Sequence, residues 1–190
     1  MERHGVVTRG AVVSEGIRGG FALVYKVLSG FEETGRARRG YFVNGLGAAQ
    51  FATGATVDRL RSFAVDPEAA STLKAVTLAA TDPANPYGAA LPWPSLQSHR
   101  PGRKAGAVVV IVDGALTLYV ERGGKSVLVF SSDVDVLTVA SRSLVTTARE
   151  RLGALRVERV DGEFAVGTPL GLALVEAGFV ATPQGLRLRG

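Results

Sequence analysis

One carboxylate in this sequence has a setting that suits catalysis. Asp82 follows a short apolar stretch and opens the segment Asp82-Pro83-Ala84-Asn85-Pro86-Tyr87-Gly88. Beside aromatic side chains, a carboxylate can stabilise a developing positive charge or activate water. An aspartate at this position also suits a turn, because its side chain can accept a hydrogen bond from the backbone of that turn. Both interpretations stay open, and the pocket that the catalytic one needs would be formed by Asn85, Tyr87 and Trp93.

Several basic residues suit contact with an anionic partner. The formal net charge is +5, and the excess lies early: nine Lys/Arg stand against five Asp/Glu up to residue 63, compared with thirteen against twelve in the longer remainder. Basic side chains on a hairpin that follows a helix can reach phosphates or a groove of DNA. We predict this role for Arg36, Arg38 and Arg39 at a hairpin tip, and for Arg18 and Lys26 beside it.

The long helix expected before that hairpin carries little positive charge. Lys26 is its one basic residue, and Glu32 and Glu33 near its end would repel a DNA backbone. We therefore expect contacts with the phosphate backbone and no sequence-specific reading of the major groove.

One glycine-rich segment resembles a nucleotide-binding motif. Gly123-Gly124-Lys125-Ser126 matches the end of a phosphate-binding P-loop, but the first glycine of that motif would fall at Tyr119. The segment also lies between two expected strands, where no helix supplies backbone N–H groups to a phosphate. We predict a hairpin turn here and no ATP hydrolysis by this chain.

The composition argues against a metal centre. The chain has no cysteine and two isolated histidines, His4 and His99, so thiolate sites and histidine clusters are not expected. We expect neither a metal nor a cofactor. No window approaches 18 uninterrupted apolar residues and the N-terminus has no signal-peptide pattern, so we expect a cytoplasmic protein with no membrane partner.

The basic residues depend on a helix and a hairpin. Apolar residues from Phe21 to Phe31 recur at helical spacing, and Gly35 stands where a glycine ends a helix. Extended residues follow from Arg36 to Val43, then a turn at 44–47 and a second arm at 48–52. With a short helix at 9–14 capped by Thr8, this predicts a winged helix-turn-helix over residues 1–65, with a domain boundary between Ala64 and Thr72.

Residues 66–190 are mainly β in this prediction. Asp113-Gly114 and Gly123-Gly124 are strong hairpin signals between three apolar runs, and a Pro-rich loop covers residues 80–104. We predict an α+β protein whose second domain is a small antiparallel β-barrel with one or two packed helices. The expected strands are 75–79, 107–112, 116–121, 126–130, 155–160 and 163–166; the expected helices are 139–152 and 168–178, followed by an extended piece to Leu188.

Three segments carry a resemblance to a known family: GFALVYKVLSGFEETGRARRGYFVNGLGAAQFA, TDPANPYGAALPWP and RKAGAVVVIVDGALTLYVERGGK. They resemble the C-terminal end of bacterial Lhr-type (large helicase-related) superfamily 2 helicases. The resemblance implies the last winged helix plus the barrel module of a protein whose motor domains hold the ATPase motifs. The same arrangement is more distantly similar to AlkZ/YcaQ-like DNA glycosylases, whose glutamine pair is not evident here. Gln50 stands alone and joins the candidate base pocket.

The resemblance implies a non-motor DNA-binding module of an ATP-dependent DNA-repair helicase. Its expected partners are the motor domains and DNA, single-stranded, duplex or in an RNA:DNA hybrid. Uracil-DNA or damaged-base glycosylase activity, with Asp82 as the carboxylate, is the alternative. A second alternative is an oligomerisation module, in which the apolar strands 107–112 and 126–130 pair between two copies.

Overall fold

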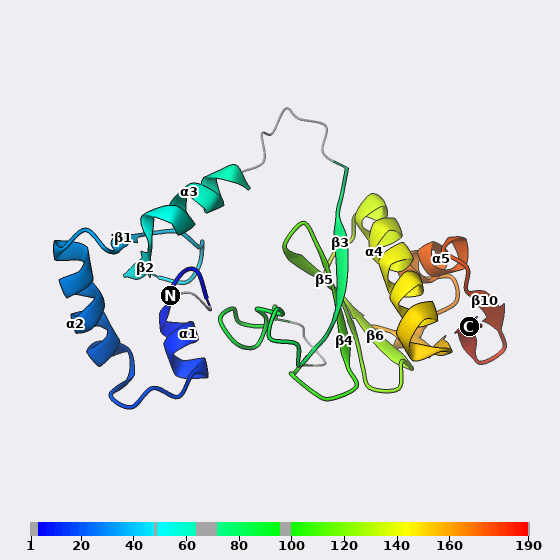
Figure 1. Cartoon of the computed structure of the whole chain (residues 1–190). Coiled ribbons are helices and arrows are strands. Elements are labelled where there is room, and N and C mark those ends of the chain that lie inside the picture. Colours follow the sequence, from blue (N-terminus) through cyan, green and yellow to red (C-terminus); the bar gives the residue numbers. More distant parts are fainter. Residues whose placement is uncertain (1–3, 48, 64–71, 96–99, 190) are drawn as a thin grey trace. The chain divides into compact units, whose positions relative to one another are not determined.

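Two compact units make up the chain. The structure, a computed structural model, describes residues 4–47, 49–63, 72–95 and 100–189. The first unit comprises residues 1–71 and 88–92, and the second comprises 72–87 and 93–190 (Figure 1). The predicted boundary from Ala64 to Thr72 lies almost wholly outside the described residues, as does His99.

The first unit contains the predicted helix-turn-helix. Helix α1 (Arg9–Ser14) begins at Thr8, whose Oγ1 accepts the N–H of Ala11 at 3.1 Å. Helix α2 (Gly20–Glu33) ends in a Schellman motif, because Gly35 adopts a φ of +71° and the next N–H, of Arg36, bonds the Phe31 carbonyl at 2.8 Å. Leu28 of α2 packs in a core with Val7, Val12 and Phe51.

The predicted wing follows directly. Strand β1 (Arg38–Gly40) pairs antiparallel with β2 (Gln50–Ala52), with Arg39 opposite Phe51. Strand β2 is buried throughout because Phe51 and Ala52 face the two small cores of this unit. Helix α3 (Gly54–Ser62) then begins at Thr53, whose Oγ1 accepts the N–H of Thr56 at 3.2 Å.

A six-stranded open sheet forms the frame of the second unit. The two predicted hairpins are confirmed, since β4 (Val108–Val112), β5 (Ala115–Val120) and β6 (Ser126–Val129) pair antiparallel in series, and β3 (Ala75–Ala79) pairs antiparallel with the other side of β4. Strand β8 (Arg159–Val160) then pairs parallel with β6, and β9 (Glu163–Phe164) forms the far edge. The order is β3-β4-β5-β6-β8-β9.

The predicted barrel is wrong. The run Leu155–Val160, expected as one strand, divides at Glu158 into β7 (Leu155–Val157) and β8. Strand β7 leaves the large sheet and joins a second sheet in the order β10-β11-β7, with β10 (Val180–Thr182) and β11 (Gly185–Leu188). Strand β7 therefore pairs outside the large sheet. Within the described residues the two edges of the large sheet are different strands, β3 and β9, so the sheet is open and not closed into a barrel.

Helix α4 (Val134–Thr147) covers one face of the large sheet, where it packs on β3, β4 and β5 (Figure 1). It continues into one turn of π-helix, η1 (Ala148–Leu152), and α5 (Pro169–Glu176) packs beside α4. Helix α4 begins five residues earlier than predicted, because Asp133 Oδ1 accepts the N–H groups of Asp135 and Val136 at 2.9 and 3.2 Å. None of the helices in the described part of the chain is long and apolar enough to cross a membrane.

Two residues of the Pro-rich loop that belong to the second unit, Tyr87 and Trp93, pack on the opposite face. Tyr119 of β5 is fully buried there, beneath Tyr87 and Trp93 of the loop. Its hydroxyl donates to the Gly102 carbonyl at 2.9 Å, and burial raises the pKa of this phenol. Burial on both faces explains why Val108–Val112 is a continuous apolar run instead of an alternating one.

The strands proposed for pairing between copies have no free edge. Strand β4 is bonded to β3 and β5, and β6 is bonded to β5 and β8. Pairing of these strands across two molecules would require breaking an existing ladder, so this route to an oligomer is not available in the folded unit.

Candidate nucleic-acid interface

A groove in the first unit brings rings and positive charges together. Its volume is about 940 Å³, and it lies between the start of α1, the first half of α2 and the wing loop. Phe21 and Tyr25 supply rings, while Arg9 and Lys26 supply charge. No carboxylate of the described residues lines the groove. Interleaved aromatic and basic side chains are the usual composition of a single-stranded nucleic-acid site, where bases stack and phosphates meet cations.

The cations lie against the rings. The guanidinium of Arg9 stands 5.4 Å from the centroid of Phe21, and that of Arg39 stands 5.9 Å from Tyr25. The two rings are 6.2 Å apart, and Tyr25 is held edge-on to buried Phe51 at 5.6 Å. The sequence pattern does not single out Arg9 and Phe21 as binding residues, because Phe21 fits the apolar stripe of α2 and Arg9 lies on another helix.

The wing arginines lie at the base of the hairpin and not at its tip, which corrects the prediction. Arg38 and Arg39 belong to β1 directly after α2, and the loop at 41–49 contains no lysine or arginine. Arg36 and Arg38 are exposed and have no ion-pair or hydrogen-bond partner for their side chains among the described residues. They are free to meet phosphates.

Arg39 has a structural task that the sequence did not reveal. Its Nη1 donates to the Tyr25 hydroxyl at 2.5 Å, and its Nε lies 3.3 Å from Glu32 Oε2. These contacts fasten the wing to α2, and they also neutralise one of the two carboxylates expected to repel DNA. Part of the donor capacity of Arg39 is therefore already used.

Helix α2 divides into flanks of different character. Lys26 faces the groove, and Arg18 is exposed in the turn before the helix. Leu23, Val27 and Phe31 form an apolar flank, with side chains 50%, 51% and 39% exposed. The outward flank of α2 is thus unsuited to phosphates, and the positive charge of this region lies beside the groove and the wing.

Gln50 is fully engaged inside the wing. Its side chain is buried, and its Oε1 accepts the N–H groups of Phe42 and Val43 at 3.1 and 2.8 Å. Its Nε2 donates to the carbonyls of Val43 and Gly47 at 2.8 and 2.9 Å. Gln50 therefore closes the wing loop. It lies in the first unit, whereas the other residues assigned to a base pocket lie in the second.

Asp82 and Asn85 organise the start of the Pro-rich loop. Asp82 Oδ1 accepts the N–H of Ala84 at 2.8 Å, as in a turn. Asn85 is buried; its Nδ2 donates to the Ala80 carbonyl at 2.9 Å and its Oδ1 accepts the N–H of Tyr87 at 3.0 Å. Asn85 thus has little hydrogen-bonding capacity left for a base.

Arg103 holds this loop together, although no sequence pattern singled it out. Its guanidinium donates to the carbonyls of Asn85 at 2.7 Å, Asp82 at 2.9 Å, Tyr87 at 3.2 Å and Thr81 at 3.2 Å. One planar cation satisfies four carbonyl groups that converge from the turn. No local pattern could have revealed this, since Arg103 lies at the far end of the loop.

The structure brings Tyr87 and Trp93 together as packing groups of the sheet. Their rings stack at 6.2 Å, and Trp93 meets Tyr119 edge-on at 5.6 Å. The Tyr87 hydroxyl donates to the Gly114 carbonyl and accepts the N–H of Leu116, both at 3.0 Å. The two rings line two different pockets, and neither Asp82 nor Asn85 lines either of them.

Comparison with known proteins agrees with the arrangement of the first unit. Residues 1–72 match the family model described as the winged-helix domain of the large helicase-related protein. The chain is 53% identical to "Lhr helicase/ probable uracil glycosylase" of Mycolicibacterium smegmatis, over 98% of this chain and 13% of the relative. It is 41% identical to "Lhr helicase/uracil glycosylase" of Escherichia coli, over 98% of this chain and 12% of that protein. The chain is thus the counterpart of a region of Lhr-type (large helicase-related) proteins that makes up about an eighth of these two relatives, and its residues 1–72 match their winged-helix domain.

Proposed function

We propose that this chain is a non-motor, C-terminal DNA-binding module of an ATP-dependent DNA-repair helicase. The observation that carries the proposal is the groove of the first unit, where Arg9 and Lys26 accompany two rings and no described carboxylate lines the wall. Arg36 and Arg38 extend the positive surface at the base of the wing. The motor domains belong to the remainder of the longer protein.

The groove favours a strand with unpaired bases. Phosphates meet the arginines and the lysine, and Phe21 offers a ring on which a base can stack. Phosphate contacts fix the position of a strand and carry no base information, so binding is expected to be sequence-tolerant and strongly salt-dependent.

The test replaces the two free arginines of the wing. Arg36→Gln with Arg38→Gln should weaken binding of unrelated single strands equally and lower the slope of log K against log[NaCl] by about 0.7 for each phosphate that is no longer neutralised. Fluorescence anisotropy with single-stranded, duplex and RNA:DNA hybrid oligonucleotides measures affinity and strand preference together. Arg59→Gln with Arg61→Gln, on α3, is the matched control of equal charge change.

An unchanged salt slope in the wing variant would remove Arg36 and Arg38 from the interface. Equal weakening by the α3 control would show that net charge alone governs binding, which also contradicts the proposal. Tight binding of one sequence over others would contradict the backbone mode of contact.

Excision of uracil is the second candidate function, because the names of both relatives include uracil glycosylase. Asp82 is the carboxylate that we propose for it, and its place in a turn leaves this role open to experiment. Incubation of the chain with a uracil-containing duplex, followed by alkaline cleavage at abasic sites, decides whether this region has the activity on its own.

A further inference from the structure

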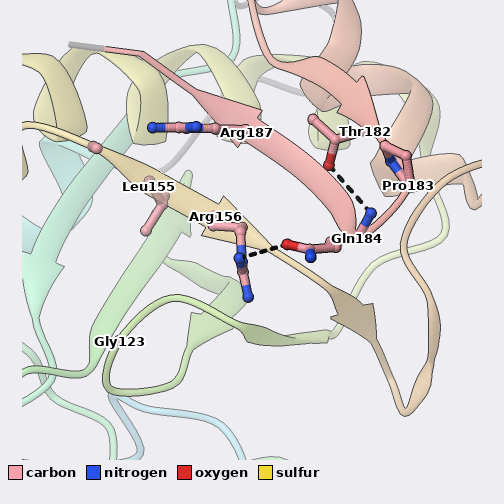
Figure 2. Close-up of a pocket in the computed structure, with 8 residues that line it drawn as sticks. Gly123, Leu155, Arg156, Thr182, Pro183, Gln184 and Arg187 are labelled. Carbon is pink, nitrogen blue, oxygen red and sulfur yellow. Dashed lines mark hydrogen bonds between the residues drawn. The ribbon is translucent and has the colours of Figure 1, made fainter.

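A second basic pocket lies beside the small sheet of the second unit (Figure 2). Its volume is about 560 Å³, and it is bounded by β7, the hairpin that joins β10 to β11, and the turn at Gly123. Arg156 and Arg187 line it, and none of its described lining residues is a carboxylate. The DNA-binding role proposed for the first unit makes no use of this pocket.

The two arginines are direct neighbours across the sheet. Arg156 of β7 is the register partner of Arg187 of β11. The residues flanking each arginine are buried, so strand alternation places both arginines on the outer face. Like charges placed directly opposite each other destabilise a sheet, and an anion that both can contact removes this repulsion. Arginine is suited to this because its planar fork donates to two oxygens at once.

A nearby carboxylate, that of Glu158, is shared between Arg156 and Lys125. Glu158 bonds Arg156, and its Oε1 lies 3.5 Å from Lys125 Nζ. The hydrogen bond from Arg156 is the main cause that lowers the pKa of Glu158, so this carboxylate stays ionised and engaged. Arg187 is exposed and has no acidic partner among the described residues. Three cations against one carboxylate leave a surplus of two positive charges.

The side-chain amide of Gln184 adds an uncharged hydrogen-bond donor beside the two arginines. Arg156 Nη1 donates to Gln184 Oε1 at 3.0 Å, which assigns the oxygen of that amide to the arginine. The amide nitrogen of Gln184 donates to no described residue. Figure 2 shows the Gln184 side chain reaching from the hairpin to Arg156. Its free N–H groups can donate hydrogen bonds to a phosphate oxygen.

The glycine turn that resembled a P-loop forms part of the wall. Gly124 is buried at a φ of +79°, and a Cβ there would lie 2.3 Å from Leu155 Cδ1 and 3.3 Å from the Arg156 carbonyl. Glycine therefore allows the turn to lie directly against β7. Lys125 follows Gly124, and its Nζ lies near the Glu158 carboxylate that Arg156 also bonds.

We propose that this pocket binds a phosphate group of a nucleic-acid strand through Arg187, Arg156 and Gln184. The donor set defines the phosphate chemistry, and the choice of a nucleic-acid strand over a free anion rests on the proposed function. The site lies on a separate unit, so it is a second backbone contact in addition to the groove of the first unit.

Replacement of Arg187 tests the site. Because its side chain is exposed and unpaired among the described residues, Arg187→Gln should fold normally, which the thermal melt verifies. It should lower the salt slope for a single-stranded oligonucleotide by about 0.7, the value for one phosphate contact. Arg142→Gln, on α4 of the same unit, is the control, since Arg142 is also exposed and its removal changes net charge equally. Equal salt slopes for the two variants would overturn the proposal.

A second measurement separates a nucleic-acid strand from free phosphate. The side-chain N–H signals of Arg187 and Gln184 in ¹H–¹⁵N spectra should shift with the oligonucleotide at a total phosphate concentration where inorganic phosphate has no effect. Equal shifts with both would make this a free-anion site and overturn the proposal. The wing variant, Arg36→Gln with Arg38→Gln, keeps the two proposals distinct. A slope that only Arg187→Gln lowers supports this site and removes the wing arginines from the interface, whereas a slope that only the wing variant lowers rejects this site alone.

Discussion

Asp82 holds its turn with one carboxylate oxygen and leaves the other available. Oδ1 accepts the N–H of Ala84 at 2.8 Å, and the half-buried side chain makes no ion pair among the described residues. Asp82→Asn keeps an acceptor for the turn, so stability and DNA binding should persist. If Asp82 stabilises a sugar cation, the rate of uracil excision should fall by roughly 10²–10³-fold.

Single-turnover excision from a uracil-containing oligonucleotide measures this effect, with DNA affinity and thermal midpoint measured on the same samples. Full activity in Asp82→Asn would assign this aspartate to the turn alone. A loss of folding would contradict the expected stability, because the amide preserves the one side-chain hydrogen bond observed for Asp82.

The arginines of this chain differ in how many of their donors are already used. Arg103 gives its guanidinium to four carbonyls of one loop, and Arg39 bonds Tyr25 and Glu32. Arg36 and Arg187 have no described partner for their side chains. Counting charges along the sequence cannot separate these groups, because the carbonyls and rings that engage Arg103 and Arg39 come from distant residues. The arginines of the second group have all of their side-chain donors available for a ligand.

At the scale of elements, the wing depends on one amide. Gln50 satisfies two N–H groups and two carbonyls of the wing loop. Gln50→Met keeps the volume and removes all four bonds, and leaving buried polar groups unpaired costs about 1–3 kcal/mol each. We expect faster amide hydrogen exchange at Phe42 and Val43, measured by NMR. Gln50→Ala, which adds a cavity, should lower protection further, and unchanged protection in both would contradict this role.

Elements with local signals were predictable from the sequence. Thr8 caps α1 and Gly35 ends α2 through contacts within a few residues, and Asp113-Gly114 and Gly123-Gly124 form the expected hairpins. The start of α4 carried a local signal too, in the cap at Asp133, which the pattern of apolar residues obscured.

Features that depend on distant partners were not predictable. Leu155–Val160 is one continuous β pattern, yet β7 pairs with β11 and β8 pairs with β6. The barrel prediction failed at this division. The candidate site shows the same limit. The sequence pattern predicted a hairpin that contains Arg38 and Arg39 but placed them at its tip, whereas the groove with Arg9 needs the packing of α1 beside α2.

At the scale of the whole molecule, each unit has its own hydrophobic core and its own basic surface. The core of the first unit centres on Leu28 and Phe51, and that of the second includes Leu144 and Leu174. The groove and the pocket beside the small sheet lie on different units. Joining two weak sites in one chain raises affinity for a strand that reaches both, without any new contact.

Separate cores predict separate unfolding. Leu28→Ala removes a buried side chain from the first unit, and Leu144→Ala does so in the second; such changes cost about 2–5 kcal/mol. Each kcal/mol lowers the midpoint of a 60–100-residue domain by roughly 4–8 °C. Differential scanning calorimetry should therefore show two transitions, the first variant shifting one and the second variant the other. A single transition that both variants lower equally would mean that the two cores unfold as one cooperative unit, and DNA binding by either unit could then not be studied apart from the other.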